Sequence, residues 1–426
     1  MEALTTPAPP KHLADDPLVS VVIPCLDEAE AIETCVREAR TALAEAGLAG
    51  EVVVVDNGSA DGSGGLARAA GARVVYEPRR GYGRAYLSGF DAARGRYIVM
   101  ADGDGSYDFH DLRRFVEELE AGADLVLGSR LHGTIHDGAM PWLHRRIGTP
   151  LLTGMLNLFF GTRVSDAHCG MRAFRRGVLP RLDLRSTGME LASEQLLRAS
   201  KCGLDIREIP IEYRPRFGQS KLSTLTDGWR HLRLLLVHSP TWLFLVPGSV
   251  LLLLGVLTAT VVLGDVELFG RHWQLHALIA AALLAIVGSQ VLEFGAFARA
   301  YAFWHLGEPD PLFDRLRRRV RFEVALACGF LLLLIGLTSC AWIVVLWMQR
   351  GLGALREEKL AIVGGTLVVL GIQIIFGSFL LSMLATRRRD ISPGDADGRP
   401  GREQLERSRP GPPASATGQR PTQSPG

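Results

Sequence analysis

Residues 18–24 read LVSVVIP, a continuous apolar run rich in β-branched side chains, and the acidic residues Asp27 and Glu28 follow it closely. Such a run predicts a buried β-strand. Similar runs recur in the first half of the chain, with helical patterns between them at residues 30–46 and 111–121. The further strands predicted in this way are residues 51–56, 73–77, 97–101 and 124–128. This alternation predicts an α/β domain with a mostly parallel sheet covered on both faces, in which ligands bind at the carboxyl ends of the strands.

Charged side chains gather where these strands end. Asp56 closes the second strand, Arg130 follows the fifth, and Asp102 and Asp104 follow the fourth with one glycine between them. A single acidic residue at such a place commonly caps a helix, which is the interpretation favoured for Asp108. Asp102 and Asp104 instead lie close enough to repel one another, and a divalent cation that also binds a diphosphate would relieve that repulsion. Oxygen ligands favour Mg2+ or Mn2+ there.

The segment GYGR at residues 81–84 contains part of a glycine-rich pattern. It lacks the full GxGxxG fingerprint and does not follow the first strand. Two interpretations stay open, a loop that approaches a phosphate or a sugar and a plain turn.

Four long apolar segments occupy the second half of the chain, at roughly residues 241–263, 275–298, 324–348 and 361–385. Each is near or above the ~20 residues that a helix needs to cross the hydrocarbon core of a bilayer. Buried helices of a soluble domain are the alternative, but four such segments would over-fill a soluble core. Glu293 interrupts the second segment, and an ionisable residue there lies near a helix end or pairs inside the bundle. We therefore predict an all-α transmembrane region of four helices.

Basic residues are concentrated on one side of the predicted spans. The segment between spans two and three and the segment after span four are rich in arginine, whereas Arg271 is the one basic Lys or Arg between spans one and two. The positive-inside rule then places the N-terminal domain and both termini in the cytoplasm, on a multi-pass protein of the cell membrane. A net charge of +2 gives little support for a nucleic-acid partner, and the lack of CxxC pairs among six cysteines argues against a zinc ribbon.

Residues 221–238 connect the two regions. Apolar positions recur there at helical spacing, with Trp229 among them, and Arg230, His231 and Arg233 lie between. The pattern is typical of an amphipathic helix in the membrane interface, and a solvated helix packed on its own domain is the alternative. The predicted divisions of the chain are a disordered N-terminus at 1–16, the α/β domain at 17–220, an interfacial helix at 221–239, the membrane domain at 240–387 and a disordered tail at 388–426.

Six short motifs occur in order along residues 18–235 and resemble those of one enzyme family. They are PCLDE (24–28), VVDNGSADGS (54–63), ADGDGSYDF (101–109), GSR (128–130), SDAHCGMRAFRR (165–176) and RFGQSKLS (216–223). Together they resemble family 2 glycosyltransferases of the GT-A fold. The nearest branch is the polyprenyl-phosphate sugar synthases, similar to dolichyl-phosphate mannose and glucose synthases. Some synthases of that branch carry membrane helices after the catalytic domain.

The resemblance implies roles for the matching positions. Residues expected to line the nucleotide pocket are Pro24, Leu26, Glu28, Asp56 and Asp102. Residues expected at the metal are Asp102, Asp104 and Ser106. Residues expected to act in catalysis are Asp104, Arg130, which would meet the donor phosphates, and Asp166, which would be the acid on the acceptor side. Residues expected to bind the acceptor phosphate are Arg145, Arg172, Arg216, Ser220 and Lys221.

The resemblance also implies an activity, that of an inverting, metal-dependent hexosyltransferase. Such an enzyme would move mannose, glucose or a similar sugar from a GDP- or UDP-linked donor to polyprenyl phosphate. A phosphate monoester is mostly dianionic at neutral pH, so this acceptor needs a cationic cradle more than a general base, and Asp166 would orient it or remove a residual proton. Two alternatives stay open, transfer to a different lipid or cell-envelope glycan and a membrane scaffold with a vestigial transferase domain. The sequence leaves a homo-oligomer open as well.

Overall fold

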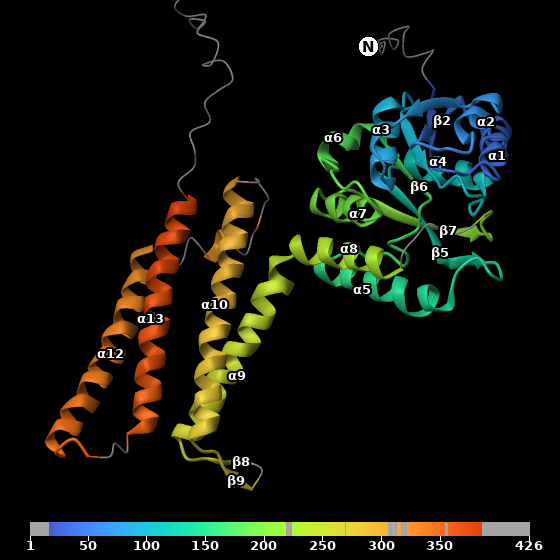
Figure 1. Ribbon diagram of the computed structural model, residues 1–426. Helices are drawn as coiled ribbons and strands as arrows, with labels where there is room; N and C mark the ends of the chain where they lie inside the picture. Colours follow the sequence, from blue (N-terminus) through green and yellow to red (C-terminus); the bar gives the residue numbers. More distant parts are fainter. Residues whose placement is uncertain are drawn as a thin grey trace, which may run out of the picture. The chain divides into compact units, whose positions relative to one another are not determined.

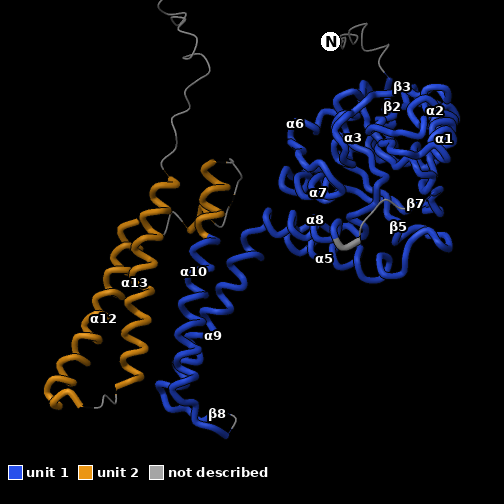
Figure 2. Tube along the Cα trace, viewed as in Figure 1, with its two compact units in different colours: residues 1–295 blue, residues 296–426 orange. Residues whose placement is uncertain are grey.

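The computed structural model describes residues 17–218, 224–268, 270–305, 310, 313–316, 322–353 and 357–385. Two compact units divide the chain, residues 1–295 and residues 296–426, and Figure 2 colours them separately. The first unit contains the α/β domain and the membrane helices up to Gly295. The second contains the membrane helices that follow.

A seven-stranded sheet forms the centre of the α/β domain, in the order β3-β2-β1-β4-β6-β5-β7 (Figure 1). Its strands are β1 (Val19–Cys25), β2 (Gly50–Asp56), β3 (Arg73–Tyr76), β4 (Tyr97–Met100), β5 (Leu125–Ile135), β6 (Arg172–Arg175) and β7 (Ile206–Tyr213). Neighbouring strands are parallel except at β6, which is antiparallel to β4 and to β5. The mostly parallel sheet expected from the sequence is confirmed, and β6 and β7 add two strands that the apolar runs do not reveal.

Helices cover both faces of the sheet, because successive side chains of a strand point to opposite faces. On β1, Val21 and Ile23 belong to a core shared with α1, α2 and α4. Val22 belongs to the opposite core, shared with α3, α5, α6 and α7. Burial on both faces is why these strands read as unbroken apolar runs. The helices of the domain are α1 (Ile32–Glu45), α2 (Ser63–Ala69), α3 (Tyr82–Ala92), α4 (Leu112–Glu120), α5 (Thr149–Phe160), α6 (Leu179–Leu182), α7 (Leu191–Lys201) and α8 (Thr224–Val237).

Within the described residues, four helices are long and apolar enough to cross a membrane, as the sequence predicts. They are Thr241–Leu263, which combines a π-helical turn with α9 (Val246–Leu263), then α10 (Leu275–His305), α12 (Phe322–Gln349) and α13 (Glu358–Ala385). Glycines let the backbones approach closely. On α12, a Cβ at Gly336 would lie 2.7 Å from the backbone oxygen of Gly364 on α13. On α9, a Cβ at Gly255 would lie 2.7 Å from the backbone oxygen of Ala281 on α10.

Candidate active site

The loops after β1 and β2 interlock at the carboxyl edge of the sheet, because the two strands pair in parallel along their whole length. Asp27 accepts a hydrogen bond from the backbone N of Ala60 at 2.7 Å. Asp56 accepts one from the backbone N of Ser59 at 2.9 Å. This edge therefore brings together the residues expected at the nucleotide, namely Pro24, Leu26, Glu28 and Asp56.

Asp102 follows β4 and is held by two tyrosines of α3. Its Oδ1 accepts hydrogen bonds from the hydroxyl of Tyr82 at 2.9 Å and from that of Tyr86 at 3.2 Å. Burial, to which the charge of Asp104 adds, raises the pKa of Asp102 to about 6. The GYGR segment thus begins a helix that supports the acidic loop. Sequence reasoning did not assign the tyrosines a role, and the available signal was their four-residue spacing on one helix face.

Asp104 lies in the same loop and has one oxygen committed to Ser106. Its Oδ1 accepts hydrogen bonds from the backbone N of Ser106 at 3.1 Å and from the Ser106 hydroxyl at 2.5 Å. The structure thus brings together the three residues expected at the metal, Asp102, Asp104 and Ser106. Two carboxylates whose charges disfavour one another, in a loop at the sheet edge, fit a hard divalent cation.

Arg216 follows β7 and lies against this acidic loop. Its Nη1 is 3.4 Å from Asp104 Oδ2, and its Nη2 is 3.7 Å from Glu28 Oε1. The backbone N of Phe217 donates a hydrogen bond to the backbone oxygen of Asp104 at 2.8 Å. The sequence assigns Arg216 to the acceptor phosphate, whereas its ion pairs in this structure lie on the side expected for the donor.

Arg130 on β5 and Asp166 in the loop before β6 form a buried ion pair. Arg130 Nε lies 2.7 Å from Asp166 Oδ2, and Nη2 lies 2.9 Å from Oδ1. Burial alone would raise the pKa of Asp166, but the guanidinium outweighs it and holds that pKa below its usual range. Two residues expected to act in catalysis are therefore in contact, and both oxygens of Asp166 have a partner.

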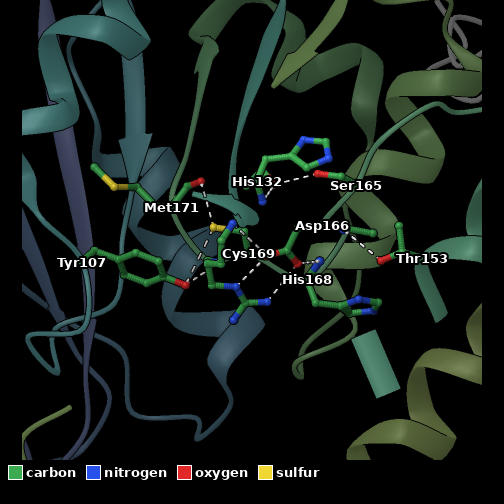
Figure 3. Close-up of polar contacts among 12 residues, drawn as sticks. Tyr107, His132, Thr153, Ser165, Asp166, His168, Cys169 and Met171 are labelled. Atoms are coloured by element: carbon green, nitrogen blue, oxygen red, sulfur yellow. Dashed lines mark hydrogen bonds and ion pairs between the residues drawn. The ribbon is translucent and has the colours of Figure 1, made fainter. Parts of the chain in front are cut away.

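The loop that carries Asp166 is also fixed through its backbone, and Figure 3 draws the contact that Thr153 makes with it. Glu208 on β7 accepts hydrogen bonds from the backbone N of Ser165 at 2.8 Å and of Asp166 at 3.1 Å. Thr153 on α5 accepts one from the backbone N of Ala167 at 3.2 Å. The Asp166 loop is therefore tied both to the sheet and to α5.

Arg172 supports the same loop from inside the domain. It is fully buried, and its guanidinium donates hydrogen bonds to the backbone oxygens of Cys169 at 2.8 Å, Ala167 at 2.7 Å and Ala192 at 2.6 Å. Buried cations need such partners. The side chain offers no surface to a ligand here, so we leave Arg172 out of the proposed acceptor site.

Exposed apolar side chains gather on α5 and on the turn before it. Those on this segment are Trp142, Leu143, Ile147, Leu151 and Leu158. Helix α8, confirmed where the sequence predicts it, packs beside α5 and exposes Trp229 and Val237 (Figure 1). Phe159 stacks on Trp242 at the start of the first membrane helix, with ring centroids 5.4 Å apart. We call α5, its preceding turn and α8 the α5–α8 surface. The sequence predicted the α8 part of this surface but not the α5 part. The strongly apolar composition of α5 was the available signal.

Among the described residues, the structure brings no other residue expected at the acceptor phosphate into contact with Asp104 or Asp166. Arg145 lies exposed in the π-helical turn His144–Gly148 before α5. Ser220 and Lys221 lie outside the described residues. Within the described part of the chain, no hydrogen bond or ion pair links Arg145 to Asp104 or Asp166.

A buried histidine pair joins α8 to the Asp166 loop. The Ser193 hydroxyl on α7 lies 2.8 Å from His231 Nδ1 and 3.3 Å from His168 Nε2, and the two imidazole rings meet edge to face at 4.6 Å. Burial lowers the pKa of His231 to about 4 and lowers that of His168 as well. Both rings are therefore neutral at pH 7.

Glu38, Asp108 and His110 form a separate group whose ligand atoms lie near enough to hold a metal ion. Arg214 already pairs with this group, with Nη1 3.4 Å from Glu38 and Nη2 2.5 Å from Asp108. Asp108 also caps a short helix by accepting a hydrogen bond from the backbone N of His110 at 2.9 Å, which confirms the capping role expected from the sequence. We read the group as an ion-pair network.

Known proteins match both regions of the chain. Residues 20–182 match the family described as Glycosyl transferase family 2, and residues 296–385 match the Glycosyltransferase family 2 C-terminal transmembrane region. The low-salt glycan biosynthesis hexosyltransferase Agl6 of Haloferax volcanii is 41% identical over 369 residues, which are 86% of this chain and 89% of that protein. A dolichyl-phosphate hexose transferase of the same organism is 36% identical over 179 residues, which are 42% of this chain and 76% of that protein.

A solved structure is similar to part of this chain. Glucosyl-3-phosphoglycerate synthase of Mycobacterium tuberculosis, in complex with Mn2+, uridine diphosphate and glucosyl-3-phosphoglycerate, matches with a TM-score of 0.42 and 24% identity. The match covers 53% of this chain and 79% of that chain.

The fold and the two family matches define a glycosyltransferase with a GT-A domain followed by a membrane region. The chain belongs to glycosyltransferase family 2. Four helices able to span a bilayer make it a membrane protein, and the resemblance read from the sequence motifs is confirmed at this level.

Proposed function

We propose that this enzyme transfers a hexose, with inversion at the anomeric carbon, from a nucleoside-diphosphate donor to polyprenyl phosphate at the cytoplasmic face of the cell membrane. The name of one relative, a dolichyl-phosphate hexose transferase, supports this class of acceptor. The α5–α8 surface supports it as well, since its exposed apolar side chains continue into the first membrane helix. A lipid-borne acceptor would then arrive beside the Asp166 loop, to which α5 is hydrogen-bonded.

On the donor side, the nucleoside would lie at the interlocked loops after β1 and β2. The residues proposed to line it are Pro24, Leu26, Glu28, Asp56 and Asp102. Asp102 and Asp104, with Ser106, would hold Mg2+ or Mn2+, because carboxylate and hydroxyl oxygens suit these cations. The bound cation would offset the negative charge that develops on the diphosphate leaving group. Arg130 would add a fixed positive charge for the donor phosphates.

The pairing of Asp166 is the observation that carries the choice of acceptor. A hydroxyl acceptor needs a carboxylate that can take its proton, yet both oxygens of Asp166 accept hydrogen bonds from Arg130. A phosphate monoester is mostly dianionic at neutral pH and can attack without such a base. In the proposed reaction Asp166 therefore orients Arg130, and the acceptor phosphate is held by the cations of Arg145 and Lys221 together with the Ser220 hydroxyl.

A product assay tests the proposal. Full-length protein purified in detergent is incubated with undecaprenyl phosphate, Mg2+ or Mn2+, and a panel of GDP- and UDP-sugars, and lipid products are identified by mass spectrometry. We expect one new glycosyl phospholipid, whose mass identifies the sugar. The product should disappear with EDTA and in the variant Asp104→Asn.

Two other results would point elsewhere. Nucleotide binding without any lipid product would favour transfer to a different lipid or cell-envelope glycan. Failure of a folded protein to bind any nucleotide would favour a membrane scaffold with a vestigial transferase domain.

A further inference from the structure

We propose that Arg216 is a built-in counter-ion of the cation site and makes the binding of metal and of nucleoside diphosphate interdependent. A divalent cation arriving alone has to displace the Arg216 guanidinium from Asp104. A nucleoside diphosphate arriving with the cation offers Arg216 a new partner. This inference rests on the metal and diphosphate roles given to the acidic loop in the proposed function.

The position of the guanidinium is the first observation. Arg216 lies between carboxylates from two different strand ends, with Nη1 3.4 Å from Asp104 Oδ2 and Nη2 3.7 Å from Glu28 Oε1. Asp104 Oδ1 is bonded to Ser106, so Oδ2 is the oxygen that faces Arg216. The side chain is about three-quarters buried, at 26% exposure. A single positive charge thus occupies the place where the acidic loop would bind a cation.

The backbone keeps Arg216 attached to this loop. The backbone N of Arg214 donates a hydrogen bond to the oxygen of Ser106 at 2.9 Å, and that of Phe217 donates one to the oxygen of Asp104 at 2.8 Å. The ring of Phe217 covers Gly105, where φ is 77° and a Cβ would lie 2.5 Å from Phe217 Cδ2. Glycine is therefore required at position 105 both for its backbone conformation and for the space that Phe217 fills.

The ion pairs themselves are loose. Both separations exceed a normal hydrogen-bond length, and Arg216 Nε is buried without a hydrogen-bond partner among the described residues. Such a guanidinium, with one unused buried donor and two long ion pairs, would be better stabilised by a group that accepts several hydrogen bonds. The oxygens of a diphosphate are acceptors of that kind, and planar guanidinium groups bind them in a bidentate manner.

Charge repulsion then couples the two ligands. A dication placed at Asp104 beside the unmoved Arg216 brings like charges within a few ångströms, which weakens its binding. The diphosphate removes this penalty, because its negative charge attracts both the dication and the guanidinium and offsets the repulsion between them. We therefore expect weak binding of the metal alone and much tighter binding of the metal together with the nucleotide.

Manganese binding measured without turnover tests the inference. Full-length protein in detergent is titrated with Mn2+, and free Mn2+ is followed by electron paramagnetic resonance, first alone and then with UDP or GDP. Without nucleotide, Arg216→Gln should bind Mn2+ roughly tenfold more tightly than the wild type, because the competing charge is gone. With nucleoside diphosphate present, this advantage should vanish or reverse. Equal Mn2+ affinity of Arg216→Gln and wild type without nucleotide would overturn the inference.

Three controls make the outcome specific. Arg207→Gln removes one positive charge from an arginine that pairs with Glu118 and Asp205, and it should match the wild type. Arg216→Lys keeps the charge and should also stay close to the wild type. If the glutamine variant fails to fold, Arg216→Met removes the same charge and should show the same tighter Mn2+ binding in its place. Asp104→Asn should abolish Mn2+ binding in every background. Wild-type Mn2+ binding by Asp104→Asn would instead overturn the metal role in the proposed function, and this inference with it.

Discussion

Arg130 and Asp166 pair through two hydrogen bonds, at 2.7 and 2.9 Å, in a place where Asp166 is fully buried. Arg130 belongs to β5 and Asp166 to the loop that leads into β6, so the pair joins neighbouring strands at the edge of the sheet. The main role of a buried carboxylate of this kind is to pair with the guanidinium and hold it in place. The arrangement gives Asp166 the role of holding Arg130 in place, and mutation can test that role.

Replacing Asp166 by asparagine should destabilise the α/β domain. The change preserves volume but leaves the buried Arg130 charge uncompensated, and breaking one side of such a pair typically costs about 3–5 kcal/mol. Thermal unfolding in detergent measures the loss. The double variant Arg130→Met with Asp166→Leu should be less destabilised than Asp166→Asn, because no unpaired charge remains. If Asp166→Asn unfolded at the wild-type temperature, the pair would contribute nothing to stability.

Removing the hydroxyl of Tyr82 should impair use of the donor. Tyr82→Phe deletes one of the two hydrogen bonds that orient Asp102, and hydrogen bonds to charged groups are typically stronger than neutral ones. We expect kcat/KM for the nucleotide sugar to fall about tenfold with the fold retained. Tyr76→Phe is the matched control, because Tyr76 is a largely exposed tyrosine on β3. Equal effects of the two variants would remove Tyr82 from the donor site.

The stability of the domain should fall in mild acid because of His231. Burial lowers the pKa of His231 to about 4, against 6.5 for an unperturbed histidine; nearby Glu190 and Asp227 act against this shift, and Arg172 adds to it. Between these two pH values the unfolded chain binds more protons than the folded one, so stability is complete above pH 6.5 and declines as pH falls toward 4. The full effect is at most about 3 kcal/mol.

His231→Gln tests this dependence. The variant should show a flatter decline of the unfolding temperature between pH 6.5 and pH 4.5 than the wild type. His132→Gln, which replaces an exposed histidine on β5, should keep the wild-type slope. A wild-type slope in His231→Gln would assign the acid sensitivity to other groups, with His168 the next to examine.

The sequence was sufficient to locate the strand ends that carry acidic residues, because the apolar runs mark β1, β2 and β4 and those residues follow directly. It placed Arg130 after the fifth strand, whereas β5 continues to Ile135 and Arg130 lies within it. It was not sufficient for β6, since residues 172–175 read RAFR and their charged ends break the strand pattern. Arg172 is the instructive residue there. The family resemblance implied a ligand contact for it, whereas the fold buries it against three backbone oxygens.

Contacts between residues distant in sequence could not be predicted from the sequence either. Tyr82 lies 20 residues before Asp102, and only the packing of α3 against β1 brings its hydroxyl to the carboxylate. Arg216 lies after β7, and its position beside Asp104 depends on the hydrogen bond from the backbone of Phe217 to the acidic loop. Spacing along the chain carries neither kind of information.

The glycines of the membrane helices should be essential where they face a neighbouring backbone and dispensable where they do not. A Cβ at Gly336 would lie 2.7 Å from the backbone oxygen of Gly364, whereas a Cβ at Gly365 meets nothing within 4 Å. Gly336→Leu should therefore force α12 and α13 apart, at a cost of about 1–3 kcal/mol or more, and lower the folded fraction in size-exclusion chromatography. Gly365→Leu adds the same side chain toward open space and gains helix propensity, so it should leave that fraction unchanged or raise it. Equal losses in both variants would mean that leucine is harmful at these depths for a reason other than contact between α12 and α13.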